Sequence, residues 1–121
     1  MPSEKSGYRP SVFVVVYAKE GNKTEYLALK RKLHWRGWEF PNEGANDGEK
    51  WEDAVRRCVR EETGLSIKFV KKFDVHGKYR YPRKFPDRPG FIGQSYSLYS
   101  AEVIKDKVKL DSHEHSAYEW L

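Results

Sequence analysis

The stretch Gly48–Leu65, with the sequence GEKWEDAVRRCVREETGL, predicts an amphipathic helix around which the rest of the chain is organised. Gly48 opens the helix, Glu49 places a carboxylate where the helix dipole favours negative charge, and Gly64 suits the left-handed closing position. Apolar side chains recur every three or four residues and form one face, which consists of Trp51, Ala54, Val55, Cys58 and Val59. This face predicts that one side of the helix packs against a core.

Two adjacent glutamates, Glu61 and Glu62, end this helix on roughly the same side as its apolar face. They repel each other, and the helix dipole opposes negative charge at a C-terminal end. A divalent cation such as Mg²⁺ or Mn²⁺ would resolve this conflict, because such ions prefer oxygen ligands. The alternative is a solvated acidic surface, since adjacent glutamates near a helix end are common on exposed faces.

The string from Glu49 to Leu65 resembles the motif of the Nudix hydrolases. In that family the order is Gly, five residues, Glu, seven residues, then Arg-Glu-apolar-x-Glu-Glu-x-Gly-apolar. The chain keeps the family's intervals at Glu49, Arg57, Glu61, Glu62, Gly64 and Leu65. It departs from the motif at Glu43, where the family has its first Gly, and at Cys58, where the family has the first Glu of the Arg-Glu pair.

Other segments resemble the branch of this family that contains bacterial RNA 5′-pyrophosphohydrolases and dinucleoside polyphosphate hydrolases. These segments are Gly7–Pro10 (GYRP), Lys30-Arg31, Trp38–Pro41 (WEFP), Tyr79–Pro82 (YRYP), Phe91–Gln94 (FIGQ), and Glu114 followed by Trp120. The resemblance covers most of residues 7–121 and implies a Nudix-type α/β/α sandwich with a mixed central sheet. Family members usually run on into a C-terminal helix, which we expect to be absent because the chain stops at Leu121.

Length and composition indicate one domain with one core, spanning residues 1–121 with a flexible segment at 1–7. The net charge of +5 suits a partner that carries phosphates. A single cysteine excludes an internal disulfide and is typical of a reducing cytoplasm. No apolar run reaches the roughly 18 residues of a membrane span, so we expect no membrane partner. The oligomeric state stays open.

Strands are predicted on both sides of the helix. A β-branched run at 11–17 predicts a buried central strand, and the alternating segment 24–30 predicts its hairpin partner. A short strand at 38–41 leads into a turn-rich loop at 42–48. After the helix we expect one or two strands in 66–79, a surface loop at 80–90, a strand at 91–103 with Tyr96, Leu98 and Ala101 pointing inward, and a strand at 113–121. This order predicts an α/β sandwich with a mixed sheet.

The resemblance implies a hydrolase that cleaves a pyrophosphate linkage in a nucleotide, a dinucleoside polyphosphate or an RNA 5′ end with bound Mg²⁺ or Mn²⁺. It implies the metal ligands Glu49, Glu61, Glu62 and Glu114, and a catalytic set of Glu61, Glu62, Glu114 and Arg57. Spacing favours a structural role for Arg57, which can pair with Glu61 one turn on. Glu49 can hold Arg57 in place or act only as a charge at the helix start.

Substrate-binding candidates lie outside the helix. Arg9 and Arg31 are expected to bind phosphates, because the guanidinium fork suits them. Trp35, Tyr79 and Tyr81 are expected to stack on a base, with core packing as the alternative. His113 and His115 flank Glu114 and raise the question of zinc, but we expect solvated surface histidines there.

The two departures leave alternatives open. Cys58 removes one hard oxygen ligand, so metal affinity and any Mg²⁺-dependent rate should fall. A thiolate could instead recruit a softer ion such as Zn²⁺ or Mn²⁺, or Cys58 could simply pack in the core. Glu43 can return an acid to the same neighbourhood, and the sequence leaves open whether it reaches the metal. The second candidate function is therefore a Nudix fold that has lost catalysis and binds a nucleotide or RNA end.

Overall fold

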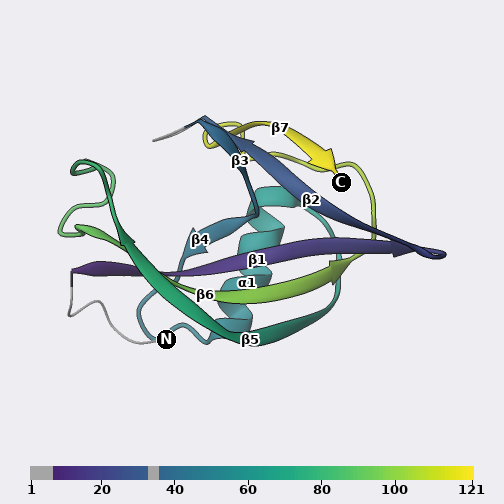
Figure 1. The fold of residues 1–121 in the computed structure, drawn as a ribbon, viewed down its shortest axis with the longest axis horizontal. Helices are drawn as coiled ribbons and strands as arrows, with labels where there is room; N and C mark the ends of the chain where they lie inside the picture. Colours follow the sequence, from purple (N-terminus) through teal and green to yellow (C-terminus); the bar gives the residue numbers. More distant parts are fainter. Residues whose placement is uncertain (1–6, 33–35) are drawn as a thin grey trace.

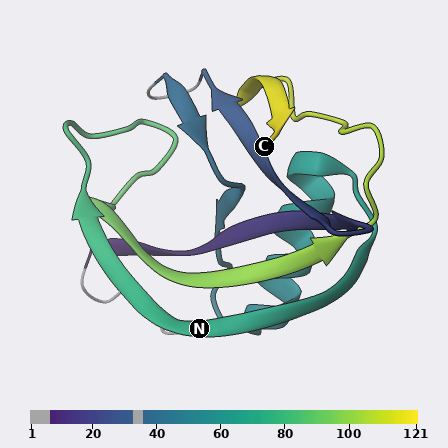
Figure 2. The same ribbon diagram turned by 45° about the vertical axis from the view of Figure 1, so that its right-hand side comes forward.

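The computed structural model describes residues 7–32 and 36–121 and places one helix against a strongly curved sheet (Figures 1 and 2). The elements in chain order are β1 (Tyr8–Glu20), β2 (Lys23–Arg31), β3 (Gly37–Glu39), β4 (Asn42–Gly44), α1 (Trp51–Thr63), β5 (Ile67–Arg80), β6 (Gly93–Val103) and β7 (His115–Trp120). Nearly all of the segment expected to be flexible, residues 1–6, lies outside the described residues.

The sheet is mixed, as predicted. Its central strand β1 runs parallel to β6, and β6 pairs antiparallel with the long strand β5. The other edge of β1 is divided between two partners: Ser11–Phe13 pair with β4, and Tyr17–Glu20 form the predicted hairpin with β2. β2 then bends away from β1 and pairs with β3 and β7. β4 is thereby held beside the middle of β1, next to α1 (Figure 1).

α1 crosses one face of the sheet and buries the predicted apolar stripe. Ala54, Val55, Cys58 and Val59 are fully buried and pack in one core with the β1 valines Val12, Val14 and Val16. In the part of the chain that the structure describes, α1 is the only helix. Within that part, no helix is long and apolar enough to cross a membrane.

The helix is shorter than predicted. It begins at Trp51 rather than Gly48, because Gly48 has a left-handed φ of 76° and Lys50 is extended at the N-cap. Glu49 therefore precedes the helix instead of lying in its first turn. The C-terminal end agrees with the prediction: Gly64 adopts the left-handed closing conformation with a φ of 70°, and its N–H donates to the carbonyls of Val59 and Arg60.

Two strand predictions were also wrong in detail. The expected loop at 42–48 begins with β4, because Asn42–Gly44 complete the free edge of β1. On β6, Tyr99, Ala101 and Val103 face the core, so Ala101 points inward as predicted. Tyr96 lies on the opposite face, beside Phe13 with the ring centroids 5.0 Å apart, and Leu98 follows it by the two-residue period. Aromatic residues on both faces of β6 hide this alternation from the sequence.

Candidate active site

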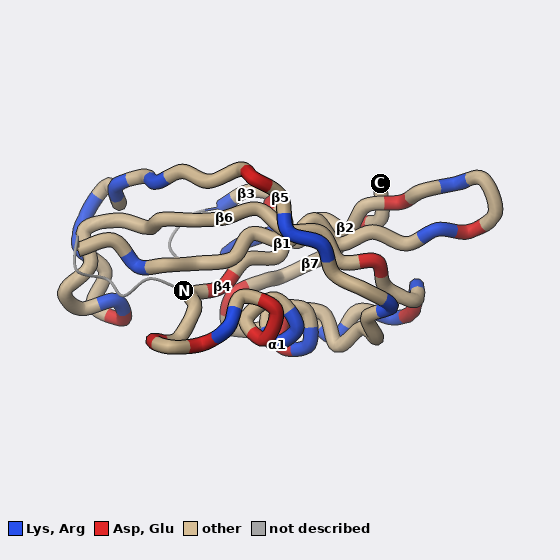
Figure 3. Tube along the Cα trace, turned by 90° about the horizontal axis from the view of Figure 1, so that it is seen from below, with Lys and Arg blue, Asp and Glu red and all other residues tan. Residues whose placement is uncertain are grey.

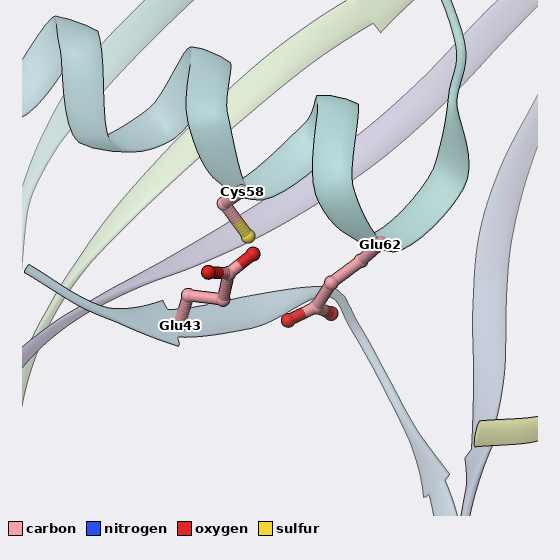
Figure 4. Close-up of side chains that lie close together, drawn as sticks. All are labelled: Glu43, Cys58 and Glu62. Atoms are coloured by element: carbon pink, nitrogen blue, oxygen red, sulfur yellow. The ribbon is translucent and has the colours of Figure 1, made fainter. Parts of the chain in front are cut away.

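Three side chains from β4 and α1 converge beneath β1. Glu43 pairs with the core-facing Val12, so its side chain points toward α1. The ligand atoms of Glu43, Cys58 and Glu62, two carboxylate oxygens and a sulfur, all lie within 4.8 Å of one another. Figure 4 shows the Cys58 sulfur directed at the Glu43 carboxylate, with the Glu62 carboxylate beside it. Glu43 thus reaches the acid cluster, a point that the sequence left open.

Arg57 ties this cluster to the chain before the helix. Its guanidinium donates to both carboxylate oxygens of Glu49 at 3.0 and 2.9 Å, to Glu43 Oε1 at 2.7 Å and to the Gly44 carbonyl at 2.7 Å. Glu61 lies 3.7 Å from the same guanidinium, so the predicted pair one helical turn apart is present. These partners, with Glu49 first, raise the pKa of Arg57 and keep it charged. Both carboxylate oxygens of Glu49 accept hydrogen bonds from Arg57. This favours the prediction that Glu49 holds Arg57 in place.

Glu62 is buried, with an exposed fraction of 1%, so the alternative of a solvated acidic face is wrong for this residue. The Asn42 N–H donates to Glu62 Oε1 at 3.3 Å, and Glu62 Oε2 has no hydrogen-bond partner. Burial, and then the charges of Glu43 and Glu114, raise the pKa of Glu62 well above its usual value. The neighbouring Glu61 side chain is about half exposed, at 49%, and remains open to solvent.

The acidic groups raise one another's pKa values. Burial, followed by the neighbouring carboxyl of Glu61, raises the pKa of Glu43 to about 8. Burial, followed by Glu62 and Glu43, raises the pKa of the Cys58 thiol. Two buried carboxylate oxygens, Glu43 Oε2 and Glu62 Oε2, lack hydrogen-bond partners. Orphaned buried oxygens in an anionic cluster are the donors that a divalent cation takes, so these residues fit a metal ion.

The predicted phosphate-binding residue Arg9 lies on the face of the sheet opposite α1. Its guanidinium occupies the space above Gly44, where a Cβ would coincide with it. Burial, and then the positive charge of Arg88, lower the pKa of Arg9. Two like charges that are close together and partly desolvated repel each other, and an anion bound between them would relieve this repulsion.

Arg88 is a candidate that the sequence reasoning missed. It is buried although it belongs to the loop expected on the surface, and it donates to the Tyr81 hydroxyl at 3.0 Å and to Gln94 Oε1 at 3.1 Å. Its guanidinium also lies over the rings of Tyr81 and Phe85. Three prolines and four basic residues made this loop look exposed, and an irregular segment has no periodicity that would single out a buried arginine.

The aromatic candidates differ in their surroundings. Tyr81 is buried, its hydroxyl donates to Gln94 Oε1 at 2.9 Å, and its ring packs on Phe85 at 4.8 Å between centroids. This favours the packing alternative for Tyr81. Tyr79 is half-buried and meets Tyr81 edge to face, and burial raises its pKa. Trp35 lies outside the described residues, so its predicted role stays a prediction.

A second buried charge cluster lies between β2, β3 and β7. Arg31, with an exposed fraction of 2%, pairs with Glu39 at 3.2 Å, and His115 Nε2 lies 3.0 Å from the same Glu39 oxygen. Burial alone raises the pKa of Glu39, but the contacts with His115 and Arg31 outweigh burial and lower it. The expectation of a solvated His115 was wrong, because β7 pairs with β2 and carries this histidine inward. His113 is exposed, as expected.

The family model described as NUDIX domain matches residues 7–121. The chain belongs to the NUDIX family.

Relatives of this NUDIX domain are RNA pyrophosphohydrolases. The one from Pasteurella multocida (strain Pm70) is 28% identical over 95% of this chain, and the chain spans only 62% of that protein's length. Among solved structures, a C. elegans Ap4A hydrolase in a binary complex is 25% identical with a TM-score of 0.67, covering 93% of this chain and 78% of the other. The E. coli dihydroneopterin triphosphate pyrophosphohydrolase, at 22% identity, has a TM-score of 0.68 and covers 94% and 82%.

The two departures from the family motif meet in space in this NUDIX domain. Cys58 stands on α1 where the motif has a glutamate, and Glu43 stands on β4 where it has a glycine, and both belong to the cluster around Glu62. The glycine position thus supplies a carboxylate next to the helix position that has lost one.

Proposed function

We propose that this chain, taken as a single NUDIX domain over residues 1–121, hydrolyses a pyrophosphate linkage in a nucleotide, a dinucleoside polyphosphate or an RNA 5′ end with Mg²⁺ or Mn²⁺. The observation that carries this proposal is the buried, unpartnered Glu62 oxygen beside Glu43, with Glu61 and Glu114 close enough to raise the pKa values of these groups. Such a carboxylate cluster is costly to bury unless a cation is bound to it.

The proposal assigns a role to each of the following site residues. Glu61, Glu62 and Glu114 would hold the metal, and Arg57 would hold Glu43 and Glu49 in place. When bound, the metal would neutralise phosphate charge and lower the pKa of the attacking water. Arg9, on the other face of the sheet, would bind a phosphate group, and Tyr79 would contact a base.

The names of the relatives support the substrate class. The Pasteurella protein is named RNA pyrophosphohydrolase, and the C. elegans structure is of an Ap4A hydrolase. Lys and Arg residues lie around the loop that joins β5 and β6, whereas Asp and Glu residues gather around β4 and the start of α1 (Figure 3). A phosphate-rich substrate would be attracted to the basic end and meet metal at the acidic cluster. The proposed location of this reaction is the cytoplasm.

A specific observation favours a second candidate function, a NUDIX domain that binds a nucleotide or RNA end without cleaving it. Cys58 stands where the family motif has a glutamate and provides no oxygen ligand. Its sulfur lowers the affinity of the cluster for a hard ion such as Mg²⁺.

The test is turnover of a small panel with Mg²⁺ and separately with Mn²⁺: diadenosine tetraphosphate, GTP, ADP-ribose and a 5′-triphosphorylated RNA oligomer. We expect the wild type to cleave one of them and Glu62→Gln to lose at least about 100-fold in rate, because it lacks a metal-binding carboxylate. Glu52→Gln, an exposed glutamate on the same helix, is the matched control. Unchanged turnover in Glu62→Gln would remove the metal site assignment.

Cys58→Glu separates the two candidate functions. It restores the carboxylate of the family motif at its own position on α1. A silent wild type with an active Cys58→Glu would favour the binding function, because one residue would then account for the lost activity. A wild type that already turns over substrate would favour the hydrolase.

A further inference from the structure

The two departures from the family motif form a ligand set of their own. Cys58, Glu43 and Glu62 place a sulfur and two carboxylate oxygens within 4.8 Å of one another, between β4 and α1, with Glu43 only partly buried. Cys58 is fully buried and Glu62 has an exposed fraction of 1%. We propose that these three residues form a thiolate-containing metal site that selects Zn²⁺, or another thiolate-binding ion, over Mg²⁺.

Each carboxylate is held by one oxygen and offers the other. Arg57 donates to Glu43 Oε1 at 2.7 Å, and the Asn42 N–H donates to Glu62 Oε1 at 3.3 Å. Glu43 Oε2 and Glu62 Oε2 are buried and have no hydrogen-bond partner. In many metal sites a hydrogen-bond donor holds the carboxylate oxygen that does not bind the metal. This contact fixes the direction of the other oxygen, which binds the metal. Here that support is in place for both carboxylates.

The donor set discriminates between ions. A thiolate is a soft ligand that binds zinc, whereas Mg²⁺ takes oxygen ligands and retains water. Three protein ligands with one position left for water or substrate is the arrangement of catalytic zinc sites. A tetrahedral zinc would bring sulfur and oxygen to about 3.6 Å from each other, and because these atoms already lie within 4.8 Å, the side chains would have to approach by no more than about 1 Å. A change of side-chain rotamer is sufficient for a movement of this size.

The proposal deepens the proposed hydrolase by naming the ion that its buried site takes, and in that sense rests on it. Glu61 and Glu114 offer only oxygen, so removing the thiol would take no ligand away from a hard ion held by them. The thiolate site can be tested without substrate, which keeps its outcome separate from that of the hydrolase.

The experiment titrates the metal-free full chain with Co²⁺ as a spectroscopic substitute for Zn²⁺, and measures Zn²⁺ affinity by competition with a chromogenic chelator. We expect a thiolate-to-cobalt charge-transfer absorption in the wild type that is lost in Cys58→Ser. Zn²⁺ affinity should fall at least about 100-fold in Cys58→Ser and about tenfold or more in Glu43→Gln. Glu52→Gln, on the exposed side of α1, is the control and should bind Zn²⁺ as the wild type does. Circular dichroism checks that each variant is folded.

The outcomes are separable. A wild type without the thiolate absorption, or Cys58→Ser and Glu43→Gln with unchanged Zn²⁺ affinity, would overturn the proposed site. If Mg²⁺-dependent turnover were observed together with that result, the hydrolase would stand and only the zinc site would fall. A thiolate absorption in a chain that turns over none of the panel would support the site and argue against the hydrolase.

Discussion

Replacing Glu43 by glutamine should change how the stability of the metal-free protein depends on pH. Burial and Glu61 raise the pKa of Glu43 from 4.5 to about 8 in the folded chain, while the unfolded chain keeps the ordinary value. Between these two values the folded state retains a proton that the unfolded state has released. The contribution of Glu43 to stability is therefore fully present below pH 4.5 and is lost as the pH rises to about 8.

The size of the effect follows from the separation of the two pKa values. Each unit of pKa corresponds to about 1.4 kcal/mol, so the loss between the unfolded value of 4.5 and the folded value of about 8 is on the order of 5 kcal/mol. The Glu43 side chain has an exposed fraction of 15%, so solvent screening reduces this figure only in part. Glutamine keeps an oxygen for Arg57 and cannot ionise, so its variant should lack this contribution.

The assay is urea unfolding followed by tryptophan fluorescence, with a chelator present, at several pH values from 5 to 8. The free energy of unfolding of the wild type should fall by up to about 1.4 kcal/mol per pH unit more steeply than that of Glu43→Gln. Glu62 and Cys58 are present in both proteins, so the difference reports Glu43 together with its effect on the titration of these two neighbours. Equal slopes would refute the reasoning. Added Zn²⁺ should flatten the wild-type slope, because an ion binds the ionised carboxylates.

Three further substitutions test single contacts. Arg57→Ala should lower the free energy of unfolding by about 1–3 kcal/mol, because it leaves the partly buried carboxyl groups of Glu43 and Glu49 without this donor, while the exposed Arg56→Ala changes it by less than about 0.5 kcal/mol in urea unfolding. Gly44→Ala should displace the Arg9 guanidinium at a cost below about 1 kcal/mol, because the guanidinium is the far end of a flexible side chain, and a larger loss in urea unfolding would contradict that freedom. Arg88→Ala should raise KM for a cleaved substrate about tenfold with little change in kcat, and an unchanged KM would show that its role is only structural.

The helix and its boundary glycine were predictable because their signals are local. The spacing of the apolar residues determines which side of α1 is buried, and Gly64 ends the helix through its own left-handed conformation. The hairpin of β1 and β2 and the inward Ala101 were predictable for the same reason. The helix start was not, because the conformations of Gly48 and Lys50 depend on how the preceding chain leaves β4.

The contacts in the site between residues that are distant along the chain could not be predicted from the sequence. Nothing local to Asn42–Gly44 indicates that this segment completes the edge of β1, yet that pairing is what turns Glu43 toward α1. From the sequence, Arg88 and His115 are expected to be exposed. Arg88 is buried because its loop folds back on Gln94, and His115 is buried because β7 pairs with β2. Burial of a polar side chain depends on partners that are distant along the chain, and residue type alone does not reveal them.

The sequence by itself determined the family, the mixed fold with one helix, and the identity of the acidic residues Glu61, Glu62 and Glu114 as site candidates. The helix, Glu61 and Glu62 follow from motif spacing and from the periodicity of apolar residues, which are properties of neighbouring positions, whereas Glu114 follows from the family resemblance. The tertiary structure alone decided that Glu43 and Cys58, the two positions that depart from the family motif, lie together beside Glu62. The reason is physical: Glu43 and Cys58 are fifteen positions apart along the chain, and only the pairing of β4 with β1 under α1 brings their side chains together.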